Sequence, residues 1–162
     1  MTILILITGG TFDKEYDEIK EQLNFKETHV PQMLIRGRCR LDIKLSIPML
    51  LDSLKMTETD RKKILEICKK SKEDKILITH GTSTIAETAK FLAKSIKNKT
   101  IVLTGAMSPY AFGSSDGLFN LGCTLAFVQT LPHGVYVAMN GRYFTHDNVR
   151  KNTSTGFFEE IK

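Results

Sequence analysis

Residues 4–13 have the sequence "LILITGGTFD", in which an apolar run ends in two glycines and a threonine. Three further apolar runs, at 75–79, 100–104 and 134–139, are also continuous rather than alternating. Strands that are covered on both faces have this pattern, because a parallel sheet carries helices on each side. Residues 40–47 alternate apolar and polar side chains instead, which predicts a strand nearer an edge of the sheet.

Helical patterns lie between these strands. They predict four helices, over residues 30–37, 58–73, 83–98 and 115–131. Thr59 is the expected N-cap of the second helix, and Asp116 is expected to cap the fourth. Strands that alternate with helices predict an α/β fold, an open and mostly parallel doubly wound sheet with helices on both faces. We expect one domain over residues 1–162, since no linker or repeat divides the chain.

Composition narrows the class of protein. Hydrophobic residues make up 41% and charged residues 25%, as in ordinary globular domains. The net charge of +5 comes from scattered lysines without interleaved aromatic residues, so nucleic acid is not an expected partner. No apolar run is long enough to span a bilayer, and the N-terminus lacks the features of a signal peptide. We therefore expect a cytoplasmic protein with no membrane partner.

Cysteine and histidine usage agrees with this expectation. Cys39, Cys68 and Cys123 are odd in number and form no CxxC pair, which favours reduced thiols. The four histidines are scattered and match no metal-binding motif, so we expect no metal. The chain also has neither a GxGxxG motif nor a P-loop, which leaves nucleotide binding without support. The first glycine-rich turn is therefore an ordinary turn or the position of a nucleophile, rather than a phosphate cradle.

The segments after the strands carry the candidate chemistry, because open α/β sheets bind ligands beyond the carboxyl ends of their strands. These segments are "TGGTFD", "THGTST", "TGAMSP" and "NGRYFTHDNVRKN". Thr11 and Thr82 place hydroxyls at the ends of two strands that could be neighbours. A threonine hydroxyl needs a base to act as a nucleophile, and a threonine after a strand more often hydrogen-bonds within a turn. Spacing alone leaves both roles open.

Five segments together resemble the N-terminal domain of the bacterial-type L-asparaginases. They are "ITGGTFD", "ITHGTSTIAETAKFL", "IVLTGAMSP", "SSDGLFNL" and "GVYVAMNGR", in the order of that family. The resemblance covers nearly the whole chain, without the family's smaller C-terminal domain. It implies the doubly wound fold of that domain and a cofactor-free hydrolysis of L-asparagine, or of a related small amide, to the acid and ammonia.

The resemblance also implies roles for individual residues. Thr11 corresponds to the nucleophile, which forms an acyl-threonine intermediate. Thr82 and Lys151 correspond to the pair that activates the nucleophile or the hydrolytic water. Aligning "VRK" with the family's pattern favours Lys151 over Arg150, and only lysine can lose its proton to act as a base.

The substrate-binding positions follow from the same resemblance. Ser53 corresponds to the serine that binds the α-carboxylate of the substrate, and Gly81 and Ala106 lie at backbone positions that line the amide site. Ser83 stands where the family has an aspartate that helps to bind the α-ammonium group. We expect this change to weaken the selection of a free amino acid.

The mobile-loop tyrosine of the family has no clear counterpart. Phe25 lies near the corresponding position but has no hydroxyl. Tyr16 is closer to Thr11 in the chain and is a candidate substitute, with the alternative that it packs on the surface of a short helix.

Two further functions remain open at this point. One is a non-catalytic module that binds an amino acid or another metabolite, since a fold does not by itself fix a function. The other is an amidase for an amide that lacks a free α-ammonium group. The longer family members complete their sites with a partner subunit, so a homodimer or a larger homo-oligomer is also expected.

Overall fold

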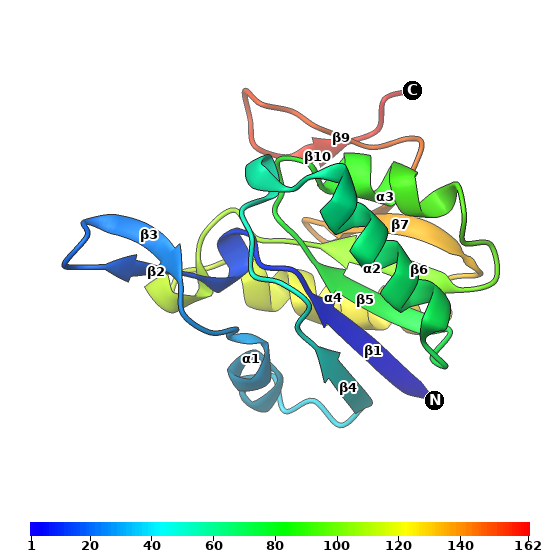
Figure 1. Cartoon of the computed structure of the whole chain (residues 1–162), viewed down its shortest axis with the longest axis horizontal. Helices are drawn as coiled ribbons and strands as arrows, with labels where there is room; N and C mark the ends of the chain where they lie inside the picture. The colour runs from blue at the N-terminus through cyan, green and yellow to red at the C-terminus, as the bar shows by residue number, and fades with distance from the viewer.

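The centre of the computed structural model, which describes residues 1–162, is a six-stranded sheet with the strand order β4-β1-β5-β6-β7-β8 (Figure 1). Its strands are β1 (Thr2–Ile7), β4 (Asp42–Ser46), β5 (Lys75–Thr79), β6 (Thr100–Thr104), β7 (Gly134–Met139) and β8 (Arg142–Thr145). The first five are parallel, and β8 pairs antiparallel with β7. The predicted mostly parallel sheet is confirmed, with β4 at one edge.

Four α-helices cover the two faces of the sheet (Figure 1). They are α1 (Val30–Arg36), α2 (Glu58–Lys70), α3 (Ile85–Ala93) and α4 (Gly117–Thr130). Successive residues of a strand point to opposite faces. In β1, Leu4 and Leu6 therefore pack in the hydrophobic cluster with α2 and α3, whereas Ile3 and Ile5 pack in the cluster with α1 and α4. The continuous apolar runs of the sequence are explained by this double coverage. None of the helices combines the length and apolar character needed to cross a bilayer.

The start of α2 differs from the sequence prediction. Thr57, not Thr59, is the N-cap: its backbone N–H donates to Asp60 Oδ2 at 2.8 Å, and its Oγ1 accepts from the Asp60 N–H at 3.3 Å. This reciprocal capping box satisfies two N–H groups that the first turn of a helix leaves free. Thr59 lies inside the first turn, where its side chain cannot perform this role.

Several short elements were not predicted. Three 3₁₀ turns occur, η1 (Thr11–Asp13), η2 (Ser53–Lys55) and η3 (Tyr110–Phe112), together with two small antiparallel pairs. The hairpin of β2 (Lys14–Asp17) and β3 (Gln22–Phe25) projects away from the central sheet, whereas β9 (Arg150–Lys151) and β10 (Phe158–Glu159) lie near the C-terminus (Figure 1). Strands of two to four residues are too short to give a periodic hydrophobic signal.

Candidate active site

Two predicted site turns lie in direct contact at the carboxyl ends of β1 and β5. Gly10 has φ +76°, and a Cβ added there would lie 2.4 Å from the Gly81 nitrogen. Only glycine permits both this backbone conformation and this approach. The turn that carries Thr11 therefore packs against the turn that carries Thr82.

Ser53 joins the same contact from η2. Its side chain is 2% exposed, and a Cβ added to Gly81 would lie 2.5 Å from Ser53 Oγ. The Thr84 hydroxyl donates to the Ser53 carbonyl at 3.0 Å, which ties η2 to the start of α3. Segments centred on residues 10, 53 and 81 are thus brought together by close packing.

Lys151 lies on β9, which pairs with β10 near the C-terminus, and its side chain extends into this region. Its Nζ donates to Thr82 Oγ1 at 2.9 Å, and the side chain is partly buried. The neighbouring Arg150 is exposed and pairs with Glu159, with 2.9 Å between Arg150 Nε and Glu159 Oε1. The structure therefore places Lys151, and not Arg150, on Thr82.

A buried histidine is hydrogen-bonded to the turn that carries Thr82. His80 is fully buried, with Nδ1 2.9 Å from the Gly81 carbonyl oxygen and Nε2 2.9 Å from Thr88 Oγ1. Thr88 Oγ1 also accepts a hydrogen bond from Arg61 Nε at 3.0 Å. A carbonyl oxygen can only accept, so His80 Nδ1 carries the ring proton and donates it to Gly81. In the neutral ring Nε2 is then an acceptor, and the Thr88 hydroxyl donates to it. Burial lowers the pKa of His80 to about 4, which keeps the ring neutral near pH 7.

This network orients one peptide group of the site. The Gly81 carbonyl accepts the proton of His80, and in a trans peptide the following N–H points to the opposite side. The N–H of Thr82 makes no hydrogen bond within the chain, and neither does the N–H of Thr11. Both are available as donors to a ligand. Sequence reasoning missed His80, Thr88 and Arg61. His80 had one signal, a polar residue directly after a buried strand, whereas Thr88 on α3 and Arg61 on α2 had none.

An ion pair fixes the base of the β2–β3 hairpin beside Ser53. Lys14 on β2 pairs with Asp52, and its Nζ also lies 5.9 Å from the centre of the Phe25 ring on β3. The Lys14 hydrogen bond and the Leu54 N–H hold the pKa of Asp52 below its usual value. No local pattern predicts that Lys14 pairs with Asp52, because 38 residues separate them.

Tyr16 is not joined to these groups. It lies on β2 opposite Leu23, its side chain is 51% exposed, and its hydroxyl makes no hydrogen bond. The alternative prediction of a short helix at this position is wrong, because the segment is a strand. Tyr16 faces a surface hollow that is also lined by Lys26.

Ser83 is exposed and makes no hydrogen bond through its side chain. It follows Thr82 directly, before α3 begins at Ile85. The position therefore offers a neutral hydroxyl rather than a carboxylate to a ligand at this edge of the sheet.

Ala106 is buried after the end of β6, and the loop that follows it is held by Asp116. The Asp116 carboxylate accepts the N–H groups of Met107 and Ser108 at 3.0 Å, and also the side-chain amide of Asn120. Asp116 occupies the N-cap position of α4, as predicted, but its side chain makes no capping hydrogen bond. Its carboxylate instead accepts the loop N–H groups, and the side chain thereby shapes the loop.

In the chain as a whole, the His, Cys, Asp and Glu side chains form no group of three or more that could hold a metal ion.

Comparison with known proteins identifies the family. Residues 2–159 match the family model described as "Asparaginase, N-terminal". The chain is 32% identical over 161 residues to an L-asparaginase of Thermococcus kodakarensis, a match that covers 96% of this chain and 49% of the relative. It is 41% identical over 98 residues to L-asparaginase 2 of Escherichia coli (strain K12), which covers 58% of this chain and 28% of the relative.

Solved structures agree with these matches. The thermostable L-asparaginase of Thermococcus kodakarensis aligns with a TM-score of 0.84 at 31% identity, over 99% of this chain and 51% of that one. L-asparaginase I of Vibrio cholerae aligns with a TM-score of 0.86 at 26% identity, over 98% and 51%. The chain thus spans about half the length of the relatives that it matches from end to end. It belongs to the asparaginase family, and corresponds to the N-terminal domain of that family.

Proposed function

We propose that this protein is an asparaginase-like amidohydrolase that converts L-asparagine, or a related small amide, to the acid and ammonia. Family membership supports the reaction class. The observation that carries the proposal is the hydrogen bond between Lys151 and Thr82, beside the contact of Gly10 with Gly81. This arrangement provides a hydroxyl nucleophile and a neighbouring amine, which is the minimum that threonine-based amide hydrolysis requires.

In the first half of the reaction, Thr11 Oγ attacks the side-chain amide carbon of the substrate. The hydroxyl proton passes through Thr82 and Lys151 to the amide nitrogen, the C–N bond breaks, and ammonia leaves an acyl-threonine ester. Negative charge develops on the amide oxygen during the attack. The free N–H groups of Thr11 and Thr82 are the donors available to stabilise that charge.

In the second half, water attacks the ester carbon. Thr82 and Lys151 take the proton from the water and return one to Thr11 Oγ as the acid leaves. Ser53 supplies a buried hydroxyl next to Gly81 for the α-carboxylate of the substrate.

Ammonia release from asparagine and glutamine tests the proposal. We expect turnover by the unmodified protein and none by Thr11→Ala, whereas Thr59→Ala, which changes an exposed threonine on α2, retains it. Absence of turnover together with measurable asparagine binding by calorimetry would instead support the non-catalytic binding module.

Ser83 favours a second candidate function, an amidase for amides that lack a free α-ammonium group. An exposed neutral hydroxyl cannot neutralise an ammonium cation, whereas a carboxylate can. Turnover of N-acetylasparagine but not asparagine would support this candidate. If asparagine is the substrate, Ser83→Asp should lower its KM, and an unchanged KM would show that position 83 does not contact the ammonium group.

The cytoplasmic location and the homo-oligomer remain predictions. Cell fractionation tests the first prediction, and the mass of the purified protein by light scattering tests the second.

A further inference from the structure

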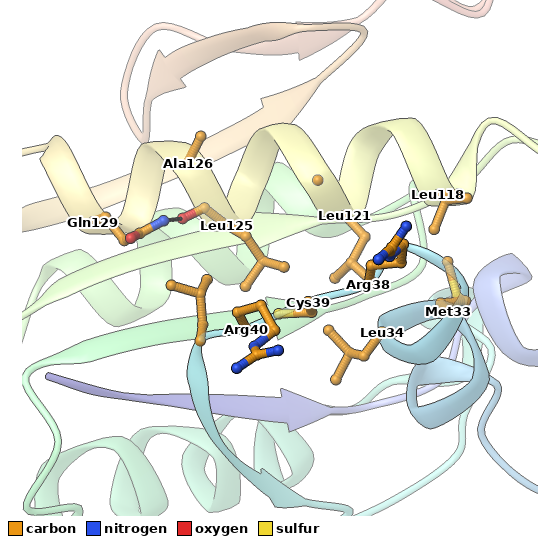
Figure 2. A pocket seen from close by; sticks show the side chains of 13 residues that line it. Met33, Leu34, Arg38, Cys39, Arg40, Leu118, Leu121, Leu125, Ala126 and Gln129 are labelled. Atoms are coloured by element: carbon orange, nitrogen blue, oxygen red, sulfur yellow. Dashed lines mark hydrogen bonds between the residues drawn. The ribbon is translucent and has the colours of Figure 1, made fainter.

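One cavity of the molecule lies away from Thr11 and Thr82. It is a groove of about 490 Å³ between α4 and the segment that joins α1 to β4 (Figure 2). Leu34 approaches from α1, Cys39 from the joining segment, and Leu121 and Leu125 from α4 (Figure 2). The volume is in the range of sites for small organic molecules, which are usually apolar with a few polar groups.

Two arginines supply the charge of this groove. Arg38 and Arg40 both line it, and neither makes an ion pair or a side-chain hydrogen bond within the chain. No acidic residue lines the groove. Arg38 has φ +50°, a left-handed conformation that costs a non-glycine residue energy and that fixes where its side chain leaves the chain. The groove is therefore apolar inside and cationic at its margin.

Gly122 keeps the wall of the groove open. It lies inside α4, where glycine destabilises a helix, and a Cβ added there would meet no atom within 4 Å. Packing against the rest of the chain does not require glycine at this position. A larger side chain at position 122 would instead project into the groove and narrow it.

We propose that this groove binds an amphipathic carboxylate, a molecule with an unbranched alkyl chain that ends in one carboxylate. The alkyl chain lies between Leu34, Leu121 and Leu125, over Gly122. The carboxylate is bound at the margin by Arg38 and Arg40, since guanidinium groups bind carboxylates with two parallel hydrogen bonds.

Charge argues for this ligand over a second copy of the chain. A two-fold symmetric pair would bring the same surface of each copy together. Arg38 and Arg40 would then face their own counterparts in an apolar contact that has no acidic residue to neutralise them. An anionic amphiphile satisfies both the charge and the apolar surface.

Titration with decanoate, below the concentration at which it forms micelles, tests the proposal by calorimetry. We expect one site per chain, with affinity increasing about two- to fourfold for each added methylene, as burial of alkyl groups predicts. Acetate lacks the chain and decyltrimethylammonium lacks the anionic head, so neither should compete. Gly122→Leu should abolish binding, and Arg38→Gln with Arg40→Gln should weaken it at least tenfold.

Two controls separate this site from non-specific effects. Arg36→Gln removes an exposed charge from α1 that does not line the groove, and should leave the affinity for decanoate unchanged. Decanoate should also slow the alkylation of Cys39, which lines the groove, without slowing that of Cys123, which does not.

Three results would overturn the proposal. They are equal binding of decanoate and decyltrimethylammonium, undiminished decanoate binding by Gly122→Leu, and a dimer that Gly122→Leu dissociates while decanoate does not bind. The last would identify the groove as a contact between copies. None of these measurements depends on ammonia release, so the proposal stands or fails independently of the amidohydrolase function.

Discussion

Lys151 Nζ lies 2.9 Å from Thr82 Oγ1, although 69 residues separate the two in the chain. If this amine moves protons for Thr82, Lys151→Met should lower kcat by about 10²–10⁴-fold, the usual contribution of a general acid or base. The measurement is the steady-state rate of ammonia release on the best amide substrate.

Arg150→Gln is the matched control for Lys151. It removes the adjacent positive charge, which is paired with Glu159 on the surface. We expect kcat within about twofold of the unmodified protein, because an exposed ion pair contributes little. A decrease in kcat as large as that of Lys151→Met would show that activity requires an intact β9–β10 pair rather than the Lys151 amine.

The neutral state of His80 predicts a loss of stability in mild acid. Its pKa is about 4 in the folded protein, below the ordinary 6.5, so the unfolded chain binds the proton more readily. Stability from this group is fully present above pH 6.5 and is lost as the pH falls toward 4. Between pH 7 and pH 5 the loss should be about 2 kcal/mol.

Urea unfolding of the unmodified protein and of His80→Gln at both pH values checks this. The variant cannot titrate at position 80, so its stability should change less between pH 7 and pH 5. Equal changes in both proteins would mean that other groups cause the dependence.

Gly81→Ala should damage the candidate site. The new methyl group would lie 2.5 Å from Ser53 Oγ and 2.6 Å from Ser53 Cβ, so η2 must move. We expect a loss of about 1–3 kcal/mol of stability, as for other overpacked positions, with a raised KM. Gly122→Ala, whose methyl group meets nothing within 4 Å, should instead stabilise the fold by about 0.5–1 kcal/mol. Urea denaturation of Gly81→Ala and Gly122→Ala measures the change in the free energy of unfolding for each variant.

The capping box of α2 predicts different effects for two nearby threonines. Thr57→Ala removes the side chain that bonds the Asp60 N–H, and should cost about 0.5–2 kcal/mol. Thr59→Ala should change stability by less than about 0.5 kcal/mol, since Thr59 is exposed inside the first turn. Thermal unfolding of the two variants measures the difference, and the reverse order would restore Thr59 as the cap.

The central sheet could be predicted from the sequence because its strands have long apolar runs. Residues 75–79 and 100–104 were predicted with the bounds that the structure has. Helix ends were less accurate: the predicted helix over 83–98 is α3 (Ile85–Ala93). Beyond Ala93 the chain leaves the helix, yet Ile96, which the helical pattern predicted on the buried face, is still buried in the core. Burial of an apolar residue therefore does not by itself mark where a helix ends.

The candidate site could be predicted only in part. The motifs after β1 and β5 named Thr11 and Thr82, and the resemblance to the family added Lys151. The pairing of Lys14 with Asp52 and the network of His80, Thr88 and Arg61 were missed. Lys14 and Asp52 are 38 residues apart and Arg61 and Thr88 are 27 apart, so no local pattern predicts these contacts.

The sequence by itself therefore determined the sheet and the turns at its edge, because hydrophobic periodicity and glycine-rich turns are local properties of the chain. The resemblance favoured Lys151 over Arg150, but only the tertiary structure shows Lys151 hydrogen-bonded to Thr82 and Tyr16 on an exposed hairpin. Which side chain reaches a site depends on the packing of distant segments. In this protein such packing brings together the turns after β1 and β5 and the η2 turn, through the close approach of Gly10, Gly81 and Ser53.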